Sequence, residues 1–195
     1  MYPHLAHVFL DGGYLREVAK LYNRFLVNPK DLGASLVNGG KVQTWAYDPT
    51  THPNTLLGRI TYYDALPADE AEGVELKAYW QAIELLDDVH LGFGELRGLK
   101  RRARQKGVDT LIAVDMVAGA FSGVFDVAIL VAGDADFVPV VEAVKRRGVM
   151  VTIAGDKESV SQDLVRVADR FVSLNADASM FPQFSGPEGR NWAAK

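Results

Sequence analysis

Cysteine is absent from this chain of 195 residues, and so is any apolar run long enough to cross a membrane. Without cysteine there can be no disulfide and no thiolate metal site, which fits a cytoplasmic protein. A membrane helix needs about 18 or more consecutive apolar residues. The N-terminal stretch MYPHLAHVFLDGG also lacks the basic and apolar regions of a signal peptide. We therefore expect a cytoplasmic protein with no membrane contact.

A basic excess is missing as well. Lysine and arginine together number 21 against 25 acidic residues, a formal net charge of −4. This excludes a uniformly basic nucleic-acid binder but leaves room for local basic patches. Histidine is scarce, and the four histidines lie outside the motifs described below. The sequence has no P-loop, no nucleophile elbow and no GxGxxG, which disfavours nucleotide hydrolysis, serine-hydrolase chemistry and dinucleotide binding.

The sequence contains short runs rich in Val, Ile and Ala, alternating with stretches of helical periodicity. This alternation predicts an α/β fold with a parallel central sheet covered by helices on both faces. Strands are predicted at residues 7–11, 41–48, 58–66, 90–99, 126–132, 149–155 and 170–174. Helices are predicted at residues 14–25, 28–37, 72–89, 108–121, 136–147 and 159–168. We expect one domain over residues 1–175, followed by an irregular tail over 176–195, where turn formers show no period.

Acidic residues stand at the ends of predicted strands. Asp11 ends the first strand, and Asp134 and Asp136 follow the apolar run ILVAG. Asp109 stands at the predicted start of a helix. In parallel sheets, ligands bind outside the carboxyl ends of the strands, where strand order reverses. Carboxylates gathered there repel one another unless a cation neutralises them, and ligation by oxygen alone suits Mg²⁺ or Mn²⁺.

Each of these acids also has a purely structural interpretation. Asp109, Asp134 or Asp136 could cap the helix that it precedes or begins. Asp11 could stabilise the turn expected at the two glycines that follow it. Capping alone explains the whole set less well than a metal site does, and one acid could serve in both roles.

Four segments resemble, in order, the motifs of the NYN domain family within the PIN-like nuclease superfamily, and most closely its LabA-like branch. They are VFLDGGYL, KGVDTLIAVDM, DVAILVAGDADFVPVVEAVKRRGVMVTIAG and SQDLVRVADRFVSL. The resemblance covers roughly residues 5–175. It implies a PIN-like, Rossmannoid α/β domain with an acidic pocket, a divalent metal and hydrolysis of RNA phosphodiester bonds. The metal-binding and catalytic acids implied by this resemblance are Asp11, Asp109, Asp134 and Asp136.

Two positions in these motifs need separate comment. Asp115 also matches a recurrent acid of the family, but it follows Asp109 by six residues, which is about 600° of helix rotation. The two side chains should point roughly 120° apart, so Asp115 is expected to support the ligands from behind or to be structural. Many family members carry Asn three residues after the first acid, where this chain has Tyr14. Tyr14 could stack on a base of the substrate or form part of the core or rim.

A basic run, KRRARQK, precedes Asp109 and has five basic side chains in seven positions. It is either a solvated turn or a patch that contacts RNA phosphates beside the metal site. The candidate contacts are Arg97, Arg101, Arg102, Arg104 and Lys106. Another basic group, Lys145 to Arg147, is expected to complement a helix C-terminus.

These observations favour a metal-dependent endoribonuclease acting on single-stranded or structured RNA. The alternative is a non-catalytic RNA-binding or regulatory module with the same fold, because the LabA-like branch is associated with regulation. A receiver or small-phosphatase domain would need a nucleophilic Asp and a downstream Lys in its own pattern, which the GDADF segment does not supply. The sequence leaves open whether the chain forms a homodimer.

Overall fold

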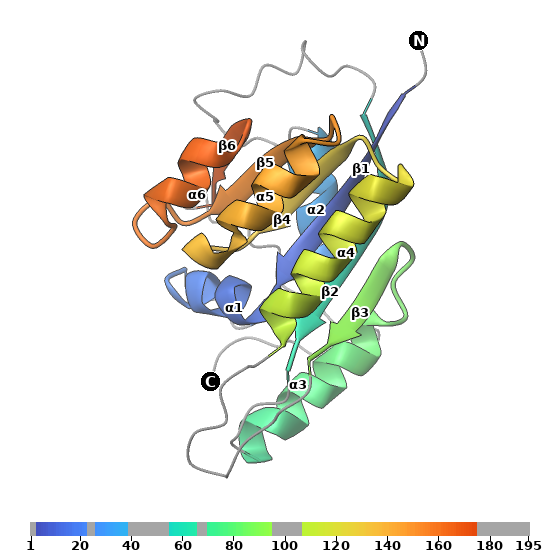
Figure 1. Cartoon of the computed structure of the whole chain (residues 1–195). Coiled ribbons are helices and arrows are strands. Elements are labelled where there is room, and N and C mark those ends of the chain that lie inside the picture. Colours follow the sequence, from blue (N-terminus) through green and yellow to red (C-terminus); the bar gives the residue numbers. More distant parts are fainter. Residues whose placement is uncertain (1–2, 23–25, 39–54, 66–69, 95–106, 175–195) are drawn as a thin grey trace.

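The computed structural model describes residues 3–22, 26–38, 55–65, 70–94 and 107–174. Their core is a six-stranded sheet (Figure 1). The strands are β1 (His4–Asp11), β2 (Thr55–Asp64), β3 (Val89–Phe93), β4 (Val127–Val131), β5 (Met150–Gly155) and β6 (Arg170–Ser173). Every neighbouring pair is parallel, in the order β3-β2-β1-β4-β5-β6. The predicted single α/β domain with a parallel central sheet is confirmed.

Helices cover the sheet on both faces. One layer contains α1 (Gly12–Lys20), α2 (Pro29–Asn38) and α3 (Glu70–Ile83); the other contains α4 (Val108–Ser122), α5 (Val138–Lys145) and α6 (Gln162–Val167). Figure 1 shows the second layer in front of the sheet. Each face of the sheet packs against one of these helical layers, because successive residues of a strand point to opposite faces.

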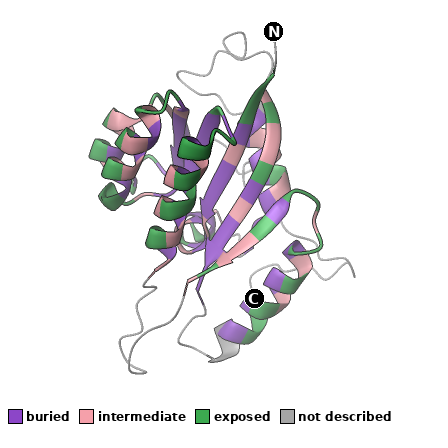
Figure 2. Cartoon of the chain, turned by 45° about the vertical axis from the view of Figure 1, so that its right-hand side comes forward, coloured by how far each residue is buried: buried purple, intermediate pink, exposed green. Residues whose placement is uncertain are grey.

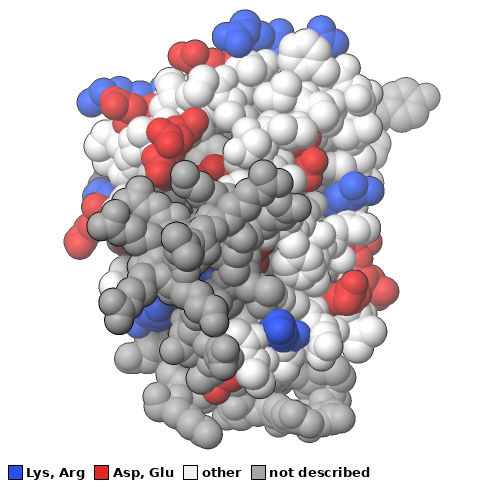
Figure 3. All heavy atoms as spheres, turned by 60° about the horizontal axis from the view of Figure 1, so that its bottom comes forward, with Lys and Arg blue, Asp and Glu red and all other residues white. Residues whose placement is uncertain are grey.

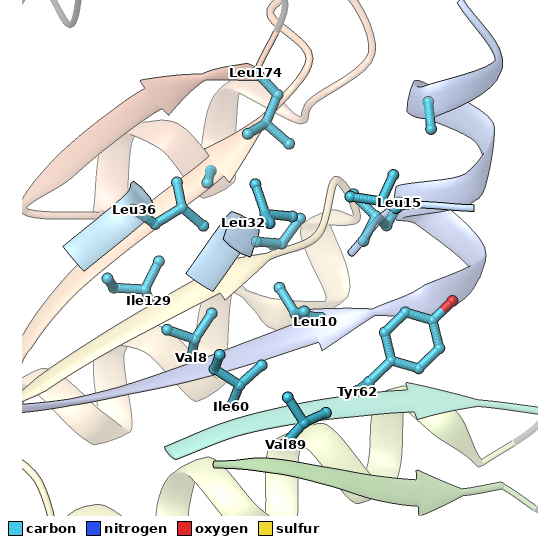
Figure 4. Packing of buried hydrophobic residues seen from close by; sticks show 14 of the residues in the cluster. Val8, Leu10, Leu15, Leu32, Leu36, Ile60, Tyr62, Val89, Ile129 and Leu174 are labelled. Carbon is cyan, nitrogen blue, oxygen red and sulfur yellow. The ribbon is translucent and has the colours of Figure 1, made fainter. Parts of the chain in front are cut away.

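The central strand β4 shows this alternation directly. Its odd-numbered residues, including Ile129, pack with α1, α2 and α3, whereas Ala128 and Leu130 pack with the other three helices. Figure 4 shows Ile129 beside Leu32 and Leu36 of α2. The middle of the sheet is buried, and exposed residues lie on the outer sides of the helices and on parts of β1, β2 and β3 (Figure 2). Strands buried on both faces must be apolar throughout, as the sequence of β4 is.

Several predicted boundaries were wrong. The helix predicted to extend to residue 89 ends at Ile83, because the chain turns at Asp88, whose φ is 66°, to enter β3. The strand predicted to extend to residue 99 ends at Phe93. The helix predicted from residue 159 begins at Gln162, since the residues before it form a turn after β5. The strand predicted at 41–48 and the tail at 176–195 lie outside the described residues.

The strand order reverses between β1 and β4. From β1 the chain builds β2 and β3 on one side, and β4, β5 and β6 follow on the other. The carboxyl ends of these strands therefore flank the crevice at which ligands bind in open parallel sheets. In Figure 1 this end of the sheet lies toward the bottom of the view. Among the helices that the structure describes, none is both long and apolar enough to cross a bilayer.

Candidate active site

A hollow of about 770 Å³ lies outside the carboxyl ends of β1 and β4. Four acids line it: Asp11 ends β1, Glu17 is in α1, Asp109 is in the first turn of α4, and Asp134 follows β4. Figure 3 brings this end forward and shows acidic side chains exposed on it. The fold therefore brings together three of the four acids predicted for the site.

Asp11 caps a helix and also faces the hollow. Its Oδ1 accepts a hydrogen bond of 3.1 Å from the backbone N–H of Tyr14, and α1 begins at the next residue. The glycines after Asp11 thus start the helix and do not form the expected separate turn. Burial, and then the nearby charges of Asp109 and Asp64, raise the pKa of Asp11 to about 6 against the lowering effect of the Tyr14 N–H. A proton or a cation would relieve this charge.

Asp134 combines the same two roles. Its Oδ1 accepts a 3.0 Å hydrogen bond from the backbone N–H of Asp136, capping the short 3₁₀ helix η1 (Ala135–Phe137) that precedes α5. Its carboxylate is exposed on the hollow. The capping interpretation and the site interpretation are therefore compatible at this residue.

Asp109 does not cap its helix. The N-cap position of α4 is Gly107, in the left-handed conformation at φ 108°, and no side chain caps this end. Partial burial, and then the negative charges of Asp134 and Asp136, raise the pKa of Asp109. Asp109 thus interacts electrostatically with the acids after β4, although it is distant from them in sequence. Asp136 lies at the edge, where it and Asp109 border a second hollow along α4.

The donor chemistry of the hollow suits a hard divalent cation. Its acidic lining offers carboxylate oxygens and neither thiolate nor imidazole, as Mg²⁺ and Mn²⁺ prefer. Within the described residues, however, no group of three or more acidic or histidine side chains is arranged to hold a metal ion as it stands. Metal ligation by the four predicted acids therefore stays a prediction.

Tyr14 forms part of the wall of the hollow. Its ring lies against Gly133 and Gly155, where a Cβ at Gly155 would come within 2.7 Å of the hydroxyl oxygen. That oxygen accepts a 2.9 Å hydrogen bond from the backbone N–H of Asp156 and lies 3.4 Å from Ser159 Oγ. Tyr14 thereby ties α1 to the ends of β4 and β5. A contact of its ring with substrate stays a prediction.

Asp115 does not line the hollow. It is exposed on α4, and its Oδ2 accepts a 2.8 Å hydrogen bond from the hydroxyl of Tyr63 at the end of β2. The contact holds α4 against the sheet near the turn from which Asp109 projects. Asp115 therefore has a structural partner that accounts for its position.

Two buried acids at strand ends escaped the sequence analysis. Asp64 ends β2 and is fully buried. Its carboxylate accepts hydrogen bonds from both terminal nitrogens of Arg16, from Trp80 Nε1 at 3.3 Å and from the Ala65 N–H at 2.8 Å. Asp156 follows β5 and caps the turn that holds Tyr14. The rule that identified Asp11, an acid at the end of an apolar strand, applies equally to both.

The predicted phosphate contacts cannot be placed. Arg97, Arg101, Arg102, Arg104 and Lys106 all lie outside the described residues. The described lining of the hollow contains no lysine or arginine. The second basic group lies where the sequence predicted, at the C-terminus of α5, with Lys145 paired to Asp169 at 2.8 Å.

The chain was compared with known families, curated proteins and solved structures. No curated protein matches it. A protein of unknown function from Vibrio parahaemolyticus RIMD 2210633 has a similar structure, with a TM-score of 0.63 and 16% sequence identity over 89% of this chain and 94% of that chain. At this identity the likeness concerns the fold alone.

The family model for the NYN domain matches residues 6–175. It does not separate the branches, so the LabA-like assignment stays a prediction. With nearly its whole length matched, the chain belongs to the NYN domain family, a family of PIN-like nucleases.

Proposed function

We propose that this protein is a divalent-metal-dependent endoribonuclease that hydrolyses RNA phosphodiester bonds at the hollow outside β1 and β4. The observation that carries the proposal is the convergence of Asp11, Asp109 and Asp134 on this hollow without a basic residue in its described lining. Like charges gathered in this way are unfavourable, and the pKa values of Asp11 and Asp109 are raised first by burial and then by the charges of neighbouring acids. A bound cation would offset this repulsion.

The acids have distinct parts in this proposal. Asp11, Asp109 and Asp134 would hold Mg²⁺ or Mn²⁺, with Asp136 at the edge of the same site. When bound, such an ion polarises the scissile phosphate and makes water more acidic. The backbone N–H groups of Tyr14 and Asp136 fix the carboxylates of Asp11 and Asp134 in place.

Polar groups on the opposite wall would bind the substrate. Ser159 and Ser161 line the hollow beside Tyr14, and hydroxyl groups can donate hydrogen bonds to phosphate oxygens. The Tyr14 ring, held by the Asp156 N–H, gives this wall a fixed position. A base of the substrate could stack on the part of the ring that faces the hollow.

The nuclease proposal is tested by incubating labelled RNA and DNA with the protein in Mn²⁺, Mg²⁺ or EDTA. Asp134→Asn should lower RNA cleavage by about 100-fold or more, because Asn keeps the shape but loses the charge that attracts a cation. Asp163→Asn is a matched control, since Asp163 is an exposed acid on α6 paired with Arg166. Circular dichroism would establish that both variants fold. Cleavage of RNA at the wild-type rate by Asp134→Asn, or by the wild type in EDTA, would contradict the proposal.

The basic run before α4, which includes Lys106, is proposed to bind RNA phosphates together with Arg97. Replacing Arg101, Arg102 and Arg104 by Gln should weaken RNA binding and flatten its salt dependence. For single-stranded RNA the slope of log K against log salt should fall by about 2, since each phosphate contact contributes about 0.7. The control is Arg166→Gln on α6, and the measurement is a salt titration by fluorescence anisotropy. An unchanged slope would make the run a solvated turn.

A second candidate is an RNA-binding or regulatory module without catalysis. It is favoured by Tyr14, which fills the position where many family members carry Asn, and by the acids of the described chain not being arranged as they stand to hold an ion. RNA that is bound but remains intact with every metal would favour this candidate. The same incubation therefore separates the two functions.

A further inference from the structure

Helix α4 has an apolar face on each side. Its inner face, with Ile112 and Met116 at the centre, is buried against the sheet. Its outer side carries Val114 and Phe121, which are 56% and 57% exposed. A helix that is apolar all round is normally buried on all sides. We propose that this outer face joins two copies of the chain in a twofold-symmetric dimer with antiparallel α4 helices.

Along α4, from Asp109 to Ala118, this face contains a pocket that is called the socket here. A hollow of about 690 Å³ lies along α4, and its rim carries Asp109 and Asp136. Its remaining lining is made of small and aliphatic groups: Thr110, Ala113, Val114, Val117 and Ala118. The socket is thus apolar inside and negatively charged at one edge, which suits an apolar group that carries a positive charge.

The C-terminal end of the same helix presents such a group. The guanidinium of Arg147, which follows α5, lies over the exposed ring of Phe121, 4.9 Å from its centroid. Cations over an aromatic face are attracted by the ring quadrupole, so the pair is held together. The Phe121 ring and the Arg147 guanidinium together form an apolar, positively charged group, called the plug here. It complements the socket, which is apolar inside and negatively charged at its edge.

Twofold symmetry brings each plug to the other chain's socket. If the axis passes through Val117, Phe121 lies four residues to one side of it and Ala113 four residues to the other. Phe121 of one chain then faces the small Ala113 of its partner, and Arg147 approaches the partner's acidic rim at Asp136. An isologous interface makes each contact twice, so the match is counted on both sides.

The chemistry of this face fits a second copy better than it fits RNA. The socket rim is acidic and would repel phosphates, whereas it attracts the guanidinium that the chain itself provides at the other end of α4. The pairing also brings an arginine of each chain to the edge of the other's acidic hollow, whose described lining has none. The dimer does not depend on the nuclease proposal, because its contacts form with or without catalysis.

The oligomeric state is the first test. Sedimentation equilibrium over a range of protein concentrations should show a monomer–dimer equilibrium. Phe121→Glu should weaken association by at least about tenfold, as expected for a buried aromatic anchor. Leu85→Glu is the matched control, because Leu85 is 75% exposed on another part of the molecule. A monomer at every concentration, or equal effects of the two variants, would overturn the proposal.

Charge reversal tests the geometry. Arg147→Glu and Asp136→Arg should each weaken homodimers, because each places like charges opposite one another. An equimolar mixture of the two variants should associate again, since both contacts in the mixed dimer then join opposite charges. Mixed samples that associate no better than either variant alone would exclude the antiparallel arrangement.

Cross-linking tests the position of the axis. The chain has no cysteine, so a single introduced thiol reports one position. With helix axes about 8–10 Å apart and Cα atoms about 2.3 Å from each axis, two facing Cα atoms are separated by about 3.4–5.4 Å, which overlaps the range of about 4.4–6.8 Å found in disulfides. Val117→Cys should therefore form a covalent dimer on oxidation and Leu85→Cys should not. A covalent dimer for neither variant, or for both equally, would contradict the proposed axis.

Discussion

Two acids at the ends of neighbouring strands differ in how their charge is compensated. Asp64, at the end of β2, is fully buried but receives hydrogen bonds from Arg16, Trp80 and a backbone N–H. Asp11, at the end of β1, is only partly buried, yet its charged neighbours include Asp109. Burial of a carboxylate alone therefore does not distinguish the proposed site from the rest of the sheet. The absence of a counter-charge among the described neighbours does so better.

The largest effect on the free energy of unfolding is expected at Asp64, whose negative charge is compensated by Arg16 and further hydrogen-bond donors. Asp64→Ala leaves the guanidinium of Arg16, a residue that is only 8% exposed, without its carboxylate partner. Loss of one member of a buried ion pair typically costs about 3–5 kcal/mol of the free energy of unfolding. Urea denaturation should show a loss of this size. Replacing both members by apolar residues, as in Arg16→Met with Asp64→Leu, should recover much of it.

If Asp64→Ala costs less than about 1 kcal/mol, the pair is not the anchor that the contrast with Asp11 requires. The double variant controls for the loss of packing, because it removes both charges and keeps the volume filled. Failure of the double variant to recover stability would assign the loss to packing and not to charge.

A smaller effect, of opposite sign, is expected at Asp11. Its pKa is about 6 in the folded protein and about 3.9 in an unfolded chain. The folded state therefore holds the proton more tightly, and stability falls as pH rises from about 4 to about 6. In EDTA at pH 8, Asp11→Asn should be more stable than the wild type. We expect a gain of about 2 kcal/mol, because a shift of about two units corresponds to nearly 3 and solvent screens a part.

The pH dependence of this gain is its control. The difference between Asp11→Asn and the wild type should shrink as the pH falls and approach zero near about pH 3, where the aspartic acid is mostly protonated in both states. Asn also keeps the helix cap, so capping is unchanged. Lower stability of the variant at pH 8 would mean that the hydrogen bonds of the carboxylate outweigh the costs of its burial and of its repulsion by other acids.

The smallest effect on the free energy of unfolding is expected at Tyr14, which donates its backbone N–H to Asp11 and accepts the Asp156 N–H at its hydroxyl. Tyr14→Phe keeps the ring against Gly133 and removes the hydroxyl that accepts from the Asp156 N–H. Loss of one hydrogen bond of this kind costs about 1 kcal/mol. The measurement is again urea denaturation. No change would mean that a water replaces the hydroxyl, and the wall of the hollow would then be less fixed than its contacts indicate.

The sequence predicted the sheet well because each strand is a short apolar run bounded by turn residues. It also predicted Asp11 and Asp134 as neighbours, since the carboxyl ends of parallel strands meet at one edge. It could not predict the pairing of Arg16 with Asp64, which are 48 residues apart in sequence. That contact depends on which strand lies beside β1, and the strand order is a property of the whole fold.

Local geometry limited the rest. The alternative in which Asp109 caps α4 was reasonable from composition, but the preceding Gly107 takes the N-cap position in a left-handed conformation. Asp88 ends the turn before β3 with a positive φ, which is uncommon for residues other than glycine. These backbone conformations arise from tertiary packing and leave little trace in hydrophobic periodicity.

The close fit of Tyr14 against two glycines constrains how this protein can vary. A Cβ at Gly133 would collide with the Tyr14 ring, and one at Gly155 would collide with its hydroxyl. Neither glycine has a positive φ, so close approach to the ring, and not backbone conformation, excludes other residues. Positions 14, 133 and 155 should therefore change together among relatives: a chain with Asn at the first has room for alanine at the others. Grafting Tyr into such a relative would require both glycines to be introduced with it.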